Sequence, residues 1–403
     1  MDTELIIPDF EIVNKNEKNS VFIIKNADVS IVNSIRRAIQ ANVNTVAFYF
    51  DAKSSENDDI RIIQNDSPLH NEFLAQRISM IPVHFTKDII DNWTQDEYSF
   101  EIDVQNTSQT FKKVTTKDIL VFKHSTQLSE AERDRVFPAN DITKDFILLT
   151  KLPPPSDSKI PTRLKAKLRC SKASGAKSSC FSPTSLCVFS NSIVEAKDLI
   201  VAEKAFVERY KNEFKKLYKA AEESPEEDAK KFPEEDIEKD AKMKFKTIEY
   251  QREFKKNKHG EPNEFKFSID SECALTPGDI FTEAVNFLIS RVENLHEKIS
   301  QESTKLKSIG QDKYELLVEH ENHTIGNLIQ AFFYNEFIRG SSSEEKISFI
   351  GYFITHPLEQ LICFKIVSKL TQTELTEFFK SGLEALKNNL TQFKDVWNQK
   401  WQS

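Results

Sequence analysis

Residues 29–39 read VSIVNSIRRAI, and residues 323–333 read HTIGNLIQAFF. Both stretches contain, in the same order, a hydroxyl residue, isoleucine, one spacer, asparagine, one spacer and isoleucine. Each follows a run of strand-forming residues, begins a helical pattern and is followed by another β-like run, at residues 45–50 and 347–354. This matched context predicts two copies of one α+β unit, the first interrupted by insertions.

Two such units are expected to pack through matched faces as a pseudo-symmetric dimer inside one chain. The copies differ where Arg36 and Arg37 are replaced by Gln330 and Ala331. The two units should therefore present chemically different surfaces. A second short helix, predicted from His70 to Met80, belongs to the first unit.

Two long amphipathic helices are predicted, one opening at Thr276 and the other running over residues 375–397. Their apolar side chains recur at steps of three and four, which places them on one face of each helix. The apolar positions are Phe281, Val285, Leu288, Val292, Leu295 and Ile299, and then Leu375, Phe379, Leu383, Leu386, Leu390, Phe393 and Trp397. Burying one such stripe is worth on the order of 10 kcal/mol before conformational entropy is counted. Neither stripe can remain in water, so we expect the two helices to pack against each other.

The composition excludes several classes of protein. The 403 residues carry 55 Lys and Arg against 63 Asp and Glu, a net charge of -8 that argues against a protein gripping nucleic acid through its own surface. The sequence contains no glycine-rich phosphate loop. No secretory leader or apolar run long enough to span a membrane is apparent, so we expect an intracellular chain with reduced thiols.

Shifts in composition suggest a domain division. The first unit is expected to be discontinuous, and residues 195–259 are dense in charge. The predicted division is 1–85 with 260–299 for the first unit, 86–194 for an inserted β-rich domain, 195–259 for a charged, partly helical insertion, 300–312 for a linker, and 313–403 for the second unit. Within the insertion we expect an amphipathic helix ending before Pro225, then a mobile acidic segment over residues 222–240.

Several motifs resemble one known family. Residues 33–38, NSIRRA, and 71–82, NEFLAQRISMIP, are similar to the alpha-like subunit of multisubunit DNA-dependent RNA polymerases. Asn71 stands where the family usually has an acid, and Gln76 stands where it usually has histidine. Residues 321–329, ENHTIGNLI, and 349–359, FIGYFITHPLE, resemble the smaller alpha-like partner subunit. A fusion of the two resembles the arrangement in some large DNA viruses.

The resemblance implies an α+β fold with two alpha-like dimerisation units, each an antiparallel sheet plus long helices. It implies a non-catalytic assembly platform that docks the second-largest and then the largest polymerase subunit, with a small zinc-binding subunit nearby. DNA would be contacted only through the complex, and no membrane is involved. A viral origin would imply the virion and the host cytoplasm, with the nucleus left open.

The resemblance also implies roles for particular residues. The residues expected to face the large subunits are Asn33, Arg36, Arg37, Glu72 and Arg77. Besides the two apolar stripes, the residues expected to hold the dimer together are His323, Gly326, Asn327, Gly351, His356 and Pro357. The two glycines are expected at close backbone approaches, and the His–Pro step is expected at a turn between strands.

No catalytic residue, cofactor or metal is expected. Cellular relatives often carry a cysteine-rich metal loop, but residues 83–110 contain no cysteine, and the spacing of Cys170, Cys180 and Cys187 fits no zinc template. Two alternatives remain open. One is a free-standing helical adaptor using residues 281–299 and 375–397. The other is an enzyme using Cys180 or Cys187 with a histidine, which lacks a recognisable activating arrangement.

Overall fold

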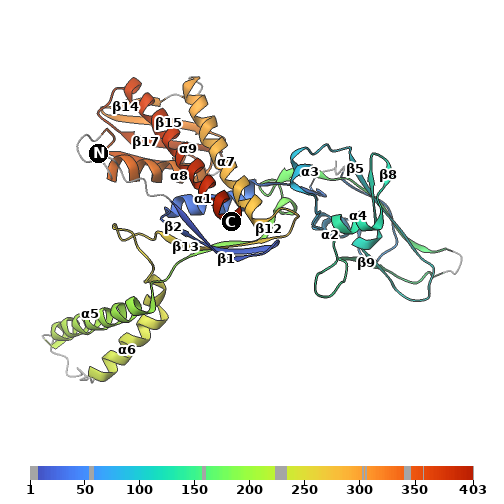
Figure 1. Cartoon of the computed structure of the whole chain (residues 1–403), viewed down its shortest axis with the longest axis horizontal. Coiled ribbons are helices and arrows are strands. Elements are labelled where there is room, and N and C mark those ends of the chain that lie inside the picture. Colours follow the sequence, from blue (N-terminus) through green and yellow to red (C-terminus); the bar gives the residue numbers. More distant parts are fainter. Residues whose placement is uncertain are drawn as a thin grey trace. The chain divides into compact units, whose positions relative to one another are not determined.

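The computed structural model describes residues 8–53, 59–156, 160–222, 234–301, 304, 306–339, 346–356 and 358–402. Contacts within the chain divide it into two compact units, which do not coincide with the two repeats predicted from the sequence. Unit 1 comprises Met1–Glu11, Ile23–Val29 and Phe189–Phe267, and unit 2 comprises Ile12–Phe22, Ser30–Val188 and Ser268–Ser403. The architecture is α+β throughout (Figure 1).

The first repeat supplies a four-stranded sheet and two helices. Its strand order is β1-β2-β13-β12. The strands are β1 (Asp9–Lys15), β2 (Asn19–Lys25), β13 (Glu264–Ser271) and β12 (Thr184–Asn191), and the helices are α1 (Val29–Asn42) and α7 (Pro277–Ser300). In β2 every second side chain is buried, as expected of a sheet with one face on a core. The buried strand predicted over residues 45–50 is shorter than expected, because β3 (Asn44–Ala47) ends before Phe48.

The second repeat forms the same kind of unit. Its sheet has the order β14-β15-β17-β16, and its neighbouring strands are antiparallel. The elements are β14 (Leu306–Gly310), β15 (Lys313–Glu319), α8 (His323–Phe333), the π-helix η4 (Tyr334–Arg339), β16 (Phe349–Ile354), β17 (Leu361–Val367) and α9 (Gln372–Gln402). The stretch expected to be a linker, residues 300–312, contains β14, which pairs with β15.

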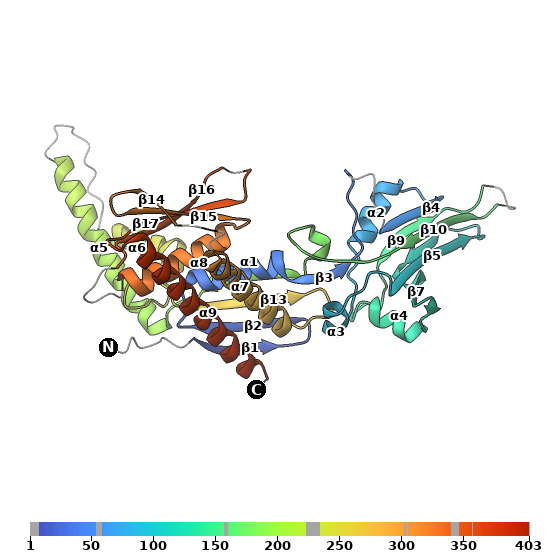
Figure 2. The same ribbon diagram turned by 90° about the horizontal axis from the view of Figure 1, so that it is seen from above.

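Between β3 and β12 the chain forms a β-rich insertion. Its largest sheet has the order β4-β10-β5-β7-β8. These strands are β4 (Ile60–Asn65), β10 (Thr162–Leu168), β5 (Tyr98–Asn106), β7 (Ile119–Lys123) and β8 (Thr126–Gln127). Smaller elements complete it, namely α2 (Asn71–Ser79), α3 (Lys87–Asp91), β6 (Lys112–Thr115), η1 (Thr116–Asp118), α4 (Glu130–Val136), β9 (Leu148–Leu152), β11 (Ser171–Ser174) and η2 (Ser179–Phe181). Figure 2 shows α2 beside β4 and β9.

The charged insertion in unit 1 is a helical hairpin. Helices α5 (Ala196–Glu222) and α6 (Glu234–Thr247) pack together, and the short helix η3 (Glu249–Arg252) follows. The Tyr210 hydroxyl donates to Asp240 at 2.7 Å, and Phe206 contacts Phe245 with ring centroids 5.7 Å apart. The first helix was predicted, but the expectation of a mobile segment was wrong for residues 234–240, which begin α6. The helix forms because Ala241 and Phe245 are buried in the hairpin despite the dense charge around them.

In the described part of the chain, no helix combines the length and hydropathy needed to cross a membrane.

Candidate protein interaction sites

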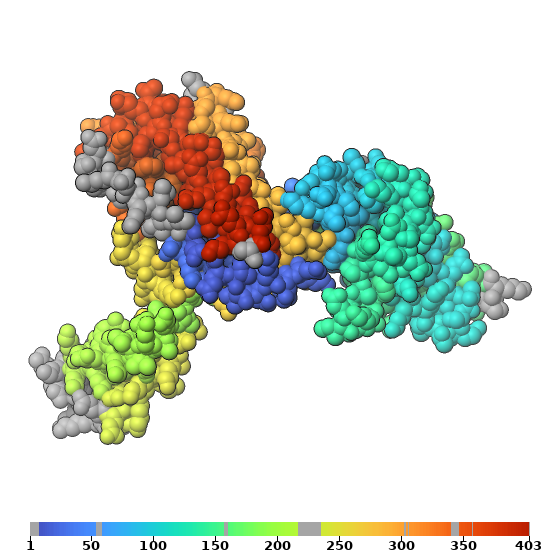
Figure 3. All heavy atoms as spheres, viewed as in Figure 1, coloured from blue at the N-terminus to red at the C-terminus, as the bar shows by residue number. Residues whose placement is uncertain are grey.

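The two amphipathic helices form the apolar seam of unit 2. Helices α7 and α9 run side by side (Figures 1 and 3), and the predicted stripe residues of both are buried. Polar contacts fix their antiparallel register, because Thr282 donates to Asn398 at 2.9 Å and Lys394 donates to Asn286 at 3.2 Å. The spacing predicted this packing, and the seam joins the first repeat to the second.

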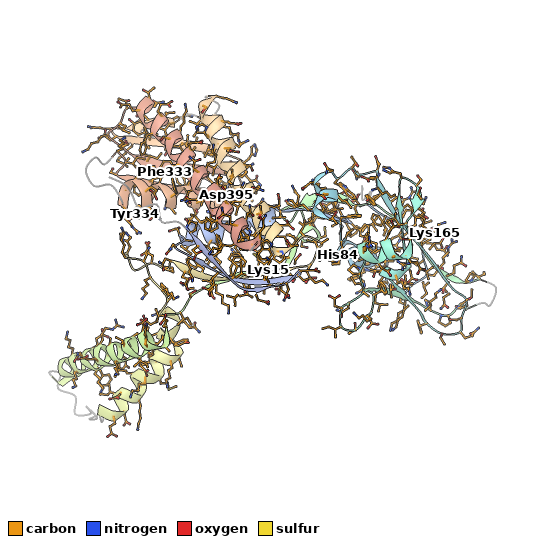
Figure 4. All side chains as sticks on the ribbon, viewed as in Figure 1. Lys15, His84, Lys165, Phe333, Tyr334 and Asp395 are labelled. Atoms are coloured by element: carbon orange, nitrogen blue, oxygen red, sulfur yellow. The ribbon has the colours of Figure 1, made fainter. Side chains whose placement is uncertain are left out.

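Aromatic side chains close one end of the seam. The rings of Phe281 and Trp397 have centroids 4.3 Å apart, and Phe22 of β2 packs on both. A Cβ added to Gly278 would come within 2.1 Å of the Trp401 indole, so this helix start needs glycine to approach α9. Lys15, labelled in Figure 4, places its ammonium 5.0 Å from the centre of the Trp401 ring.

The short helices α1 and α8 meet through a polar contact. Arg37 of α1 donates from Nε to the Thr324 hydroxyl at 2.8 Å, and Ser34 donates to the Thr324 carbonyl at 3.4 Å. Thr324 is buried. Arg37, which was expected to face a large subunit, is exposed, and its Nε also bonds to the opposite repeat of its own chain.

Arg36 precedes Arg37 on the same helix and points about 100° away from it. Its guanidinium donates to Asn33 Oδ1 from Nε at 3.1 Å and from Nη2 at 3.0 Å, and to Gln40 Oε1 from Nη1 at 2.9 Å. Asn33 and Arg36 are half-buried and Gln40 is exposed. These bonds hold the guanidinium flat along the helix surface, where a partner can reach it.

The motif helix α2 lies in the inserted domain and not in the first repeat, where it was predicted, because it packs on β4 and β9. His70 caps it, with Nδ1 accepting from the Phe73 amide at 3.4 Å, and Glu72 is exposed in its first turn. Arg77 donates to the carbonyls of Leu149 at 2.9 Å and Leu148 at 2.7 Å. Arg77, which was also expected at an interface, is exposed, and its guanidinium joins α2 to β9.

A buried ion pair between the repeats gives no signal in the sequence. Arg291 of α7 donates to Glu321 Oε1 from Nε at 2.9 Å, and Nη2 lies 2.7 Å from the same oxygen. Nη2 also donates to the His320 carbonyl at 2.8 Å. Burial raises the pKa of Glu321, and the charge of Arg291 opposes that rise. The two residues stand 30 positions apart, Arg291 on α7 of the first repeat and Glu321 in the loop before α8 of the second, so no spacing rule could pair them.

The second repeat uses its glycines for close approaches, as predicted. A Cβ on Gly326 would lie 2.5 Å from the Tyr352 ring, and one on Gly351 would lie 2.9 Å from the Phe349 ring. Nδ1 of His323 lies 3.2 Å from the hydroxyl of Tyr352.

The other predicted residues of this repeat lie at the start of α8 and after β16. Asn327 is half-buried on α8. Nδ1 of His356 accepts from the Leu358 amide at 3.2 Å, which is a turn contact. Pro357 lies outside the described residues.

The cysteines show no activation. Burial raises the pKa of Cys187 to about 12 and also raises the pKa of Cys170 and Cys180. Thiols of this kind are poor nucleophiles because little thiolate forms. Among the residues that the structure describes, no cluster of three or more His, Cys, Asp or Glu could hold a metal ion.

Two segments of the chain match known families. Residues 21–292 match the family described as the RNA polymerase Rpb3/Rpb11 dimerisation domain, and residues 313–396 match a second family with the same description.

Relatives of known name match shorter stretches. The chain is 31% identical over 83 residues to the DNA-directed RNA polymerase subunit Rpo3 of Methanobrevibacter smithii, covering 21% of this chain and 27% of that protein. It is 27% identical over 146 residues to the DNA-directed RNA polymerase II subunit rpb3 of Dictyostelium discoideum, covering 32% and 45%. It is 33% identical over 75 residues to Rpo3 of Thermococcus kodakarensis, covering 19% and 26%. The chain therefore spans less than half the length of these relatives.

Proposed function

This chain belongs to the RNA polymerase Rpb3/Rpb11 dimerisation family, and from that premise we propose that it is a non-catalytic assembly subunit of DNA-directed RNA polymerase. The observation that carries the proposal is the presence of two such domains in one chain, with α7 of the first packed on α9 of the second. A free-standing helical adaptor is not favoured, because it would explain the seam but not the two matched domains.

The proposed partners are the largest and second-largest polymerase subunits, with a small zinc-binding subunit docking nearby. DNA would be reached only through the assembled complex. Asn33 and Arg36 are our proposed docking residues on α1, and Glu72 is the one on α2, because these side chains are exposed or half-buried. Arg37 and Arg77 are exposed as well and remain proposed docking residues. Each also bonds inside the chain, Arg37 from Nε to the Thr324 hydroxyl and Arg77 from Nε to the Leu149 carbonyl.

We propose that the two dimerisation units are held together by the stripe residues of α7 and α9. We assign the same role to His323, Gly326, Asn327, Gly351 and His356. Because β4 and α2 belong to the inserted domain, its boundary with the first dimerisation unit is proposed after β3 and not at residue 85. The other proposed segments are unchanged, with 260–299 closing the first dimerisation unit, 195–259 as the charged insertion, 313–403 as the second dimerisation unit and 300–312 connecting the two. The fused arrangement supports a viral source, with the virion and host cytoplasm as the site of action and the host nucleus as the alternative.

The proposal is tested by co-expressing the tagged chain with the two largest polymerase subunits of its source and identifying what co-purifies. Asn33→Ala with Arg36→Ala should leave the helical circular dichroism signal unchanged and lose the second-largest subunit. Arg252→Ala, which removes an exposed arginine of η3 paired with Glu249 at 2.9 Å, is the matched control and should recover both subunits. Recovery of neither subunit by the wild-type chain would refute the proposal.

A further inference from the structure

The outer face of the inserted domain's main sheet carries a basic stripe, defined as Arg61, Arg163, Lys165 and Lys167. Strand β10 alternates, with Leu164, Ala166 and Leu168 buried and the three cationic side chains on the opposite face. The antiparallel register pairs Lys167 with Arg61 of β4 on one side and with Glu101 of β5 on the other. Figure 4 labels Lys165 on this sheet.

The charges of this face do not cancel. The Arg163 guanidinium donates two hydrogen bonds to the Asp103 carboxylate, from Nε to Oδ1 at 2.7 Å and from Nη2 to Oδ2 at 2.6 Å. Lys165 lies 3.8 Å from the same carboxylate, and Lys167 lies 3.6 Å from Glu101, so both contacts are longer than a direct hydrogen bond. Arg61 is exposed and makes no ion pair within the described part of the chain. At one end of the stripe the Asp66 carboxylate accepts from the Arg163 amide at 2.8 Å. Four cations therefore face three carboxylates, which leaves a local positive charge on a chain whose net charge is -8.

The stripe is open to solvent and has apolar neighbours. The Lys167 side chain is 62% exposed. Ile63 of β4, at the irregularity between the partners of Lys165 and Ala166, is 51% exposed. On the opposite flank, Leu120 and Phe122 of β7 are half-buried and lie across from Glu101 and Ser99. A partner with carboxylates in its centre and aliphatic side chains at its edges would complement this face.

Nucleic acid fits the face less well. Proteins that bind single strands on a sheet usually stack bases on exposed aromatic rings, and Phe122 on this face is half-buried.

From these observations we propose that the basic stripe is a docking surface for an acidic segment of a protein partner, with aliphatic residues of that segment resting on Ile63 and on the β7 flank. The proposal does not depend on the polymerase assignment, because it uses a surface of the inserted domain away from the seam residues. Its electrostatic part should weaken with added salt, as exposed charge pairs are screened.

The test uses the full chain and a fluorescein-labelled peptide rich in Glu and Asp with interspersed leucines, followed by fluorescence anisotropy. The stripe variant is Arg61→Glu, Lys165→Glu and Lys167→Glu. The matched control makes the same charge change at three exposed lysines of the same domain, Lys113, Lys117 and Lys151. We expect the stripe variant to bind about tenfold or more weakly and the control to stay within about twofold of the wild type.

A milder variant, Lys165→Gln with Lys167→Gln, keeps the test valid if the charge reversals unfold the domain, and it should still bind more weakly than the wild type. Equal losses in the stripe variant and the control would show that only net charge matters and would overturn the proposal, as would no binding by the wild type. Tighter binding of a labelled single-stranded RNA than of the peptide would also overturn it, in favour of a nucleic-acid surface.

Discussion

The buried pair of Arg291 and Glu321 provides a direct test of how the two repeats are held together. The Glu321 side chain is 5% exposed and that of Arg291 is 28% exposed. Arg291→Met keeps much of the side-chain volume but removes the cation, so a buried carboxylate loses its counter-charge and its two hydrogen-bond donors. Removing one partner of a buried pair costs about 3–5 kcal/mol. Because Arg291 is partly exposed and water can replace part of its bonding, we expect the free energy of unfolding to fall by about 2–3 kcal/mol at pH 7.

The destabilisation caused by Arg291→Met should be smaller at acidic pH. The pKa of Glu321 is raised above its ordinary value of 4.5, with burial as the largest cause. A carboxyl group with a raised folded pKa binds its proton more tightly when folded, so its contribution to stability declines as the pH rises from the unfolded pKa through the folded one. Removing Arg291 raises the folded pKa of Glu321 further. The variant therefore gains more stability than the wild type when the pH is lowered toward the unfolded value.

The assay is urea unfolding followed by tryptophan fluorescence, since Trp397 is buried in the seam. The wild type and Arg291→Met are compared at pH 7 and at about pH 5, with Arg291→Met/Glu321→Gln as the matched double variant. The double variant should recover more than half of the loss, because it no longer buries an unpaired charge. An equal loss at both pH values, or a double variant no more stable than the single one, would refute the reasoning.

Three further predictions concern packing and thiol chemistry. Leu288→Ala, in the centre of the seam, should lower the free energy of unfolding by about 2–5 kcal/mol in the same urea assay, because it leaves a cavity at a fully buried position. Gly382→Ala should cost about 1–3 kcal/mol, since its Cβ would lie 2.4 Å from the buried Phe333 ring, whereas Gly310→Ala has nothing within 4 Å and should change the melting temperature little. Cys187 should resist a disulfide reagent at about pH 8 until urea unfolds the chain, because burial raises its pKa to about 12; peptide mapping of the labelled thiol checks this, and rapid native labelling would contradict it.

The parts of the fold that follow from local spacing could be predicted from the sequence. The three-and-four periodicity of α7 and α9 placed their apolar residues on one face, and a stripe of that size has to be covered. The helix predicted from His70 to Met80 is found as α2, capped by His70, because capping and the following proline act over a few residues. The close approaches at Gly326 and Gly351 were also expected, since each is unusual in a chain with eight glycines.

What could not be predicted depends on residues distant in the sequence. Two adjacent arginines on a helix must point in different directions, but nothing local says that Arg37 bonds to Thr324, 287 positions away, while Arg36 bonds within its own helix. The same holds for Arg77, whose partners are backbone carbonyls and leave no signature in side-chain identity. The start of α6 could not be predicted, because the dense charge of this segment is typical of a solvated chain. The helix depends on Ala241 and Phe245, which are buried because α5 packs against α6.

The strand β14 begins six residues after α7 ends at Ser300, and α9 then folds back along α7. Each polypeptide consequently carries its two dimerisation domains in a fixed one-to-one ratio, whatever the rate of synthesis. Neither domain can accumulate without its mate and expose a bare apolar helix to aggregation or proteolysis. A substitution in one dimerisation domain can also be compensated by a substitution in the other within a single gene. The sequence of the seam can therefore change while its two helices stay complementary in shape.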